Sequence, residues 1–154
     1  MAMRYKRALI AAGVALAAAT AVVAVVRPFG PPAPDPGDAA LVSLGREVYA
    51  AHCASCHGAT LEGQPNWRER KPDGLLPAPP HDASGHTWHH GDAQLLAMVR
   101  DGLAPFAPPG YRSDMPAFKD VLSEREIAAV LAYIKSTWPA DVRERQARTT
   151  AQQR

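Results

Sequence analysis

The two cysteines of this 154-residue chain lie in the stretch HCASCHG, residues 52–58. Cys53, Cys56 and the histidine that follows them, His57, form the pattern C-x-x-C-H. Three chemistries use two thiols at this spacing: a zinc site, a dithiol redox switch and covalent attachment of haem. Because each requires a different surrounding fold, the rest of the chain has to decide among them.

Three segments have the periodicity of amphipathic helices, and no segment has a convincing strand pattern. They are residues 38–54, 91–102 and 123–138. In the first, apolar side chains recur at three- and four-residue steps and lead directly into the cysteine motif. The sequence therefore predicts an all-α domain.

The ends of the second and third helices carry capping signals. Asp92 is expected to cap the second helix, and Gly102 to stop it. Ser123 and Glu126 have the spacing of a capping box, and Pro139 prevents the third helix from continuing. The predicted apolar stripe of the third helix is Ile127, Val130, Leu131, Ile134 and Trp138.

The connections between these helices are unusually long. Residues 58–91 and 103–120 show no periodicity, and loops of that length inside a compact domain generally serve a function. Three short helices also bury little apolar surface. A large apolar cofactor in the centre, wrapped by the loops, would supply the missing core.

That expectation separates the three chemistries. A redox dithiol normally follows a strand, whereas this cysteine pair follows a helix. A structural zinc ion requires about four ligands, which the cysteines could complete only with distant residues. The stretch GHTWHHGD supplies such candidates, His86, His89 and His90. Neither alternative explains why His57 directly follows Cys56, whereas haem attachment does: two thioethers hold the haem edge and the adjacent imidazole reaches the iron.

The N-terminus carries an export signal. Residues 8–26 form an unbroken apolar run after three basic residues. As a helix these residues would span about 28 Å, close to a membrane core of about 30 Å. The segment 1–26 is therefore expected to be an uncleaved inner-membrane anchor, with a cleaved signal peptide as the alternative. In both cases the rest of the chain would face the periplasm.

The composition of the remaining residues indicates a linker, a folded domain and a C-terminal tail. Residues 27–37 contain five prolines and predict a semi-rigid linker. The folded domain is expected over 38–139, followed by a polar, solvated tail at 140–154. The predicted domain has nine Lys and Arg against twelve Asp and Glu, and this acidic balance argues against binding of nucleic acid.

Three segments of the chain carry a resemblance to a known family: the motif CASCH, the MPAF loop at 115–118 and the final helix SEREIAAVLAYIKSTWP. Together they resemble the class I cytochromes c. The resemblance covers residues 41–138 and extends, through GHTWHHGD, to a membrane-anchored bacterial subgroup. It implies several short helices wrapped around one covalent haem c. It also implies single-electron transfer between redox protein partners, without a small-molecule substrate. The first and last helices would cross near the haem, with Gly45 allowing their close approach and Tyr49 packing alongside.

The resemblance also implies the site residues. Cys53 and Cys56 would bind the haem covalently, and His57 would be one axial ligand of the iron. Met115, which precedes a proline in a polar loop, would be the distal ligand, while Met98 lies inside a helix and is interpreted as core filling. A proline carbonyl would accept the N–H of the axial imidazole; the stretch LPAPPHD offers Pro77, Pro79 and Pro80, of which Pro79 is preferred.

The remaining candidate residues are two tryptophans and four histidines. Trp67 and Trp88 are candidate donors to the haem propionates, with loop packing as the alternative. His52 is interpreted as a partly buried helix residue, and the three histidines of GHTWHHGD as packing residues or a second metal site. The competing functions are a haem peroxidase-like enzyme with a labile sixth ligand and a zinc-binding interaction module.

Overall fold

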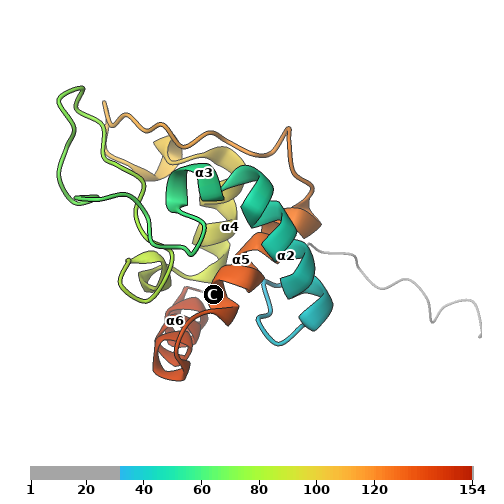
Figure 1. Ribbon diagram of the computed structural model, residues 1–154. Helices are drawn as coiled ribbons and strands as arrows, with labels where there is room; N and C mark the ends of the chain where they lie inside the picture. The colour runs from blue at the N-terminus through green and yellow to red at the C-terminus, as the bar shows by residue number, and fades with distance from the viewer. Residues whose placement is uncertain (1–31, 154) are drawn as a thin grey trace, which may run out of the picture. The chain divides into compact units, whose positions relative to one another are not determined.

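The computed structural model describes residues 32–153, and all its regular elements are helices (Figure 1). In chain order they are α2 (Ala39–His52), α3 (Ala54–His57), η2 (Thr87–His89), α4 (Asp92–Asp101), η3 (Ala104–Phe106), α5 (Glu124–Ser136) and α6 (Ala140–Gln152). The all-α prediction is confirmed for this part of the chain. The predicted anchor lies outside it, as do residues 27–31 of the predicted linker. Between residues 32 and 153, no helix is both long and apolar enough to cross a membrane.

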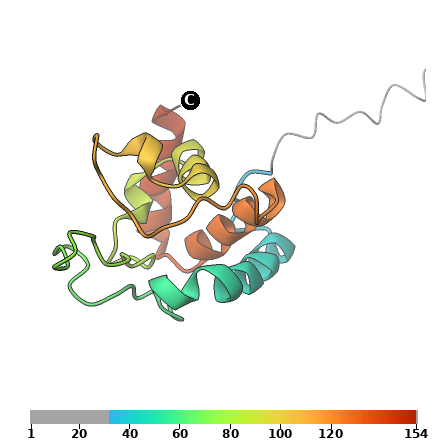
Figure 2. The same cartoon turned by 90° about the horizontal axis from the view of Figure 1, so that it is seen from above.

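Helices α2 and α5 lie side by side (Figures 1 and 2), and most residues of α5 are buried. Their close approach depends on Gly45, because a Cβ atom there would lie 1.9 Å from the Ala129 carbonyl oxygen and 2.9 Å from Tyr133 Cβ. Tyr49 packs beside the same crossing, with its ring centroid 5.5 Å from that of Tyr133. The roles expected for Gly45 and Tyr49 are confirmed.

The variant Gly45→Ala should therefore be strongly destabilised. The added methyl group meets backbone, which cannot rotate away, so the helices must separate. We expect the free energy of unfolding to fall by about 3 kcal/mol, at the upper end of what overpacking commonly costs. Chemical denaturation measures this, with Ser43→Ala on the exposed face of α2 as the control. Equal stability of the two variants would show that the crossing tolerates a side chain at position 45.

Helix α5 follows the sequence prediction closely. The Ser123 side chain accepts a hydrogen bond from the Glu126 backbone, and the Glu126 carboxylate accepts one from the Ser123 backbone, which completes the capping box. The helix ends at Ser136, before Pro139. The predicted stripe is buried along its whole length: Ile127, Val130, Leu131, Ile134 and Trp138 are each at most 4 % exposed.

Helix α4 was predicted correctly at only one end. Gly102 follows it with a φ of +78°, in the region that favours glycine. The predicted N-cap is wrong, since Gly91 is the cap and Asp92 is the first helical residue. The Asp92 carboxylate instead accepts hydrogen bonds from Lys135 Nζ at 2.8 Å and Gln146 Nε2 at 2.7 Å. The side chain thus joins α4 to α5 and α6.

The prediction of a solvated tail at 140–154 is also wrong. Residues Ala140–Gln152 form α6, which packs against η2 and buries Val142 and Gln146. Gln146 is 1 % exposed, and its amide also donates to the His90 carbonyl oxygen at 3.2 Å. A helix held by one valine and a buried amide has no apolar stripe, which is why its periodicity was not visible in the sequence.

Candidate haem-binding site

The cysteine motif forms a single helical turn at the end of α2. The N–H of Cys56 and that of His57 both donate to the Cys53 carbonyl oxygen, at 3.1 and 2.9 Å. Residues three and four positions apart lie on one face of a helix, so the turn presents both sulfur atoms and the imidazole together. Both cysteines are free thiols; Cys53 is partly buried and Cys56 is exposed.

His57 is held in the form that a metal ligand requires. Its side chain is buried, and Nδ1 lies 2.8 Å from the Pro79 carbonyl oxygen. Because a carbonyl only accepts, Nδ1 carries the proton and Nε2 keeps its lone pair. Burial lowers the pKa of His57, and the hydrogen bond to Pro79 opposes this only in part. The ring is therefore neutral near pH 7, with Nε2 available for coordination.

Two glycines allow the chain to pass close to the backbone that carries the Pro79 carbonyl. A Cβ atom at Gly63 would lie 2.4 Å from the Pro80 nitrogen, and one at Gly85 would lie 2.0 Å from the Pro80 carbonyl oxygen. Gly63 also donates its N–H to the His57 carbonyl oxygen at 2.8 Å. Sequence reasoning did not identify either residue. Their only signal was glycine itself within a long loop, which does not reveal where a backbone passes close by.

The environment of Cys53 weakens the dithiol interpretation. Burial, followed by the effect of Cys56, raises the pKa of the Cys53 thiol to about 11. Reactive redox cysteines instead have lowered pKa values, since the thiolate is the nucleophile. A structural metal site finds no support either. Within residues 32–153, no three His, Cys, Asp or Glu side chains converge in an arrangement that could hold a metal ion.

The three histidines of GHTWHHGD take packing roles. His86 stacks on Trp67 with ring centroids 5.5 Å apart, and His89 stacks on Trp88 at 3.7 Å. The remaining histidine, His90, places Nδ1 3.2 Å from Gln94 Oε1. The hypothesis of a second metal site among these three residues therefore has no geometric basis in the described part of the chain.

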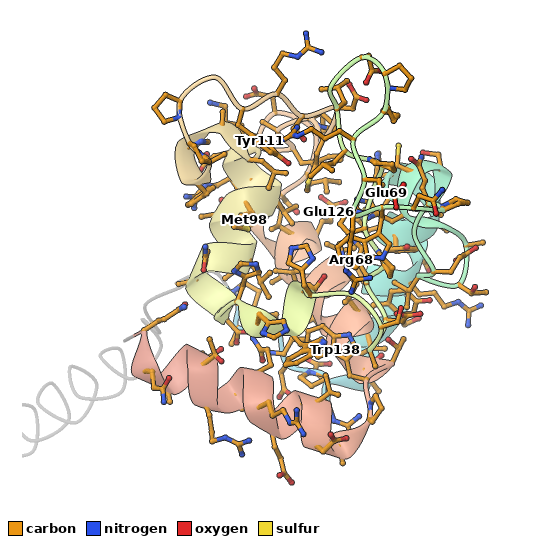
Figure 3. The ribbon with its side chains drawn as sticks, turned by 90° about the vertical axis from the view of Figure 1, so that its left-hand side faces the viewer. Arg68, Glu69, Met98, Tyr111, Glu126 and Trp138 are labelled. Atoms are coloured by element: carbon orange, nitrogen blue, oxygen red, sulfur yellow. The ribbon has the colours of Figure 1, made fainter. Side chains whose placement is uncertain are left out.

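Met115 lies in a loop that is held by polar contacts to another segment of the chain. Its side chain is partly buried and packs against the main hydrophobic cluster, as Cys53 does. The loop is joined to the irregular segment 66–75 by an ion pair between Lys71 and Asp114 at 3.2 Å and by a hydrogen bond from Arg112 to the Asp73 carbonyl. Met98, on α4 (Figure 3), is only partly buried and is not one of the residues of the main cluster.

Two weaker expectations are not supported. The indole N–H of Trp88 donates to the Ala83 carbonyl oxygen at 3.3 Å, so it is engaged in the loop. The Arg68 guanidinium lies over Trp67, with Cζ 3.9 Å from the centroid of the indole ring, and Trp67 also stacks on His86. Both tryptophans thus pack within the loop. His52 is exposed rather than partly buried, with its ring edge-on to Phe118.

The donor set fits a covalently attached haem. Two free thiols and a neutral imidazole with an unprotonated Nε2 lie on one turn, and partly buried apolar side chains surround it. A family model described as Cytochrome c matches residues 42–138. The chain therefore belongs to the cytochrome c family, and its cofactor is a covalently bound haem c. Helix α6 lies beyond the matched region.

Curated relatives agree with this assignment. The chain is 33 % identical over 119 residues to cytochrome c6 of Picosynechococcus sp., covering 77 % of this chain and 89 % of that protein. It is 27 % identical over 92 residues to the cbb3-type cytochrome c oxidase subunit FixP of Azorhizobium caulinodans. That match covers 60 % of this chain but only 28 % of FixP. No solved structure matches significantly.

Proposed function

We propose that this protein is a single-electron carrier rather than an enzyme, with one haem c attached through Cys53 and Cys56. The observation that carries the proposal is the His57 imidazole, held by the Pro79 carbonyl on the same turn as two free thiols. When bound, the haem supplies the one-electron redox couple. The chain attaches it, orients His57 and limits access to the metal.

We assign the two axial positions to His57 and Met115. The bond from His57 Nδ1 to the Pro79 carbonyl increases the basicity of the coordinating nitrogen and fixes its direction. Met115 is suited to the opposite position because its loop is braced by Lys71 and packs against the same cluster as Cys53. With both positions filled by protein ligands, no substrate can reach the metal without displacing one.

A redox titration separates the carrier from the peroxidase-like alternative. The purified haem protein should titrate as a reversible one-electron couple and exchange electrons with a small redox mediator. It should show no saturable turnover of hydrogen peroxide. Saturable peroxide turnover together with a high-spin ferric spectrum would instead establish the enzyme.

We further propose that residues 1–26 hold the haem domain at the periplasmic face of a bacterial inner membrane. The proposal depends on the apolar run 8–26 and its preceding basic residues. The protein should remain with membranes after a high-salt wash, and protease added to spheroplasts should digest the haem domain. A soluble periplasmic form beginning near Val22 or Val25 would show that the segment is cleaved.

A further inference from the structure

A second imidazole lies against the face of the axial histidine. The rings of His57 and His81 are stacked, with centroids 4.0 Å apart and an interplanar angle of 25°. The two residues are 24 positions apart in the sequence, and His81 belongs to the loop that also supplies the Pro79 carbonyl. The backbone of that loop thus delivers two separate contacts to one imidazole ring.

The two contacts constrain different motions of His57. The hydrogen bond from Nδ1 to the Pro79 carbonyl lies in the plane of the ring and fixes the direction of the Nδ1–H bond. Because a hydrogen bond tolerates bending by tens of degrees, it still leaves the ring some rotation about its Cβ–Cγ bond. A flat group stacked on the ring face opposes that rotation, because any turn of the imidazole would drive its edge into His81.

His81 is itself held at three points. Its Nδ1 lies 2.8 Å from the Thr87 hydroxyl, and its backbone N–H donates to the Leu61 carbonyl oxygen at 2.8 Å. Its carbonyl oxygen accepts a hydrogen bond of 2.7 Å from the indole of Trp138. Trp138 is 2 % exposed and lies where α5 runs into α6 (Figure 3). The ring is therefore anchored to the core rather than to a free loop.

From this geometry we infer that His81 is a positioning residue, which sets the rotational orientation of the axial His57 imidazole. The inference rests on the proposed role of His57 as an axial ligand. The orientation of an axial imidazole plane determines how unpaired spin is distributed over a ferric low-spin haem. It also affects the reduction potential, as axial ligand identity and second-shell contacts do. His81 acts only through His57.

The test compares two apolar replacements of similar bulk. His81→Phe keeps a flat ring against His57, whereas His81→Leu fills the space without one. In the ferric haem protein, the hyperfine-shifted haem methyl resonances and the low-spin g values report the orientation of the axial plane. We expect His81→Phe to retain the parental order and spread of these resonances. We expect His81→Leu to change both and to shift the reduction potential, while the haem remains covalently bound.

Equal spectra in the parent and both variants would overturn the inference, and so would equal changes in both variants. If His81→Leu does not yield haem protein, His81→Asn decides, because an amide can keep a polar contact with the Thr87 hydroxyl but places no ring against His57. That variant should shift the methyl resonances, and unchanged resonances would overturn the inference. If the parent lacks the spectroscopic signature of a coordinated imidazole, the proposed ligation itself fails, together with this inference.

Discussion

The double variant Cys53→Ser/Cys56→Ser should retain no covalently bound haem and should fail to form a stable domain. Serine is close to cysteine in size, so packing is nearly preserved while both thioethers are lost. Within residues 32–153 none of the five α-helices is longer than 14 residues. A small helical domain with long loops buries little apolar surface of its own, so binding of the cofactor is coupled to folding. Intact-protein mass spectrometry and far-ultraviolet circular dichroism measure the two effects, on protein made together with haem-attachment machinery.

Single variants provide the controls for this experiment. Cys56→Ser alone should keep one thioether, because Cys53 is unchanged. Ser55→Ala lies between the two cysteines at an exposed position, and its mass should include the full haem. A double variant that still carries covalent haem and folds normally would contradict the assignment of the attachment site.

The variant Met115→Ala should keep its covalent haem but lose the sixth ligand. A thioether stabilises ferrous iron relative to ferric, so its loss should lower the reduction potential. The variant should become high-spin and should bind carbon monoxide in the ferrous state, which the parent should resist. The bracing contacts between Lys71 and Asp114 are exposed, so they should not compensate for the missing side chain. Visible spectroscopy with and without carbon monoxide measures the change.

Met98→Ala is the matched control for Met115→Ala. Because Met98 is only partly buried, its truncation should cost roughly 1–2 kcal/mol of unfolding free energy, less than the loss of a buried methionine. Its visible spectrum should equal that of the parent. If Met98→Ala alters the spectrum while Met115→Ala leaves it unchanged, the distal ligand has been assigned to the wrong methionine.

A histidine can replace the lost ligand only after breaking existing contacts. The rings of His86 and His89 are stacked on tryptophans, and His81 is both stacked on His57 and bound to Thr87. Conversion of Met115→Ala to a low-spin species should therefore be slow or incomplete near neutral pH. Rapid formation of a bis-histidine spectrum would show that this loop opens easily.

The features that could be predicted from the sequence depend on residues that are close together in the chain. The capping box at Ser123 and the apolar stripe of α5 each depend on residues a few positions apart, so periodicity and spacing predicted them. The resemblance to class I cytochromes c supplied the glycine at the α2–α5 crossing and the Pro79 carbonyl. Both matched contacts in the structure: Gly45 lies against Ala129, and Pro79 accepts from His57.

The features that the sequence did not reveal depend on polar contacts between distant segments. The carboxylate of Asp92 appeared to be an N-cap, yet it binds Lys135 and Gln146, 43 and 54 residues away. Helix α6 has no apolar stripe, because it packs through the buried amide of Gln146 and a single valine, Val142. The stack of His81 on His57 was invisible for the same reason, since nothing in the spacing of the two residues indicates that their rings meet.

The most direct test of the proposed carrier is the visible spectrum of the purified haem protein in its oxidised and reduced states. We expect a low-spin c-type spectrum in both states, with the charge-transfer band of a methionine-ligated ferric haem in the oxidised state. The pyridine haemochrome should show one haem with both vinyl groups saturated. Carbon monoxide should leave the reduced spectrum nearly unchanged. A high-spin ferric spectrum that binds carbon monoxide immediately on reduction would contradict His57 and Met115 as the two axial ligands.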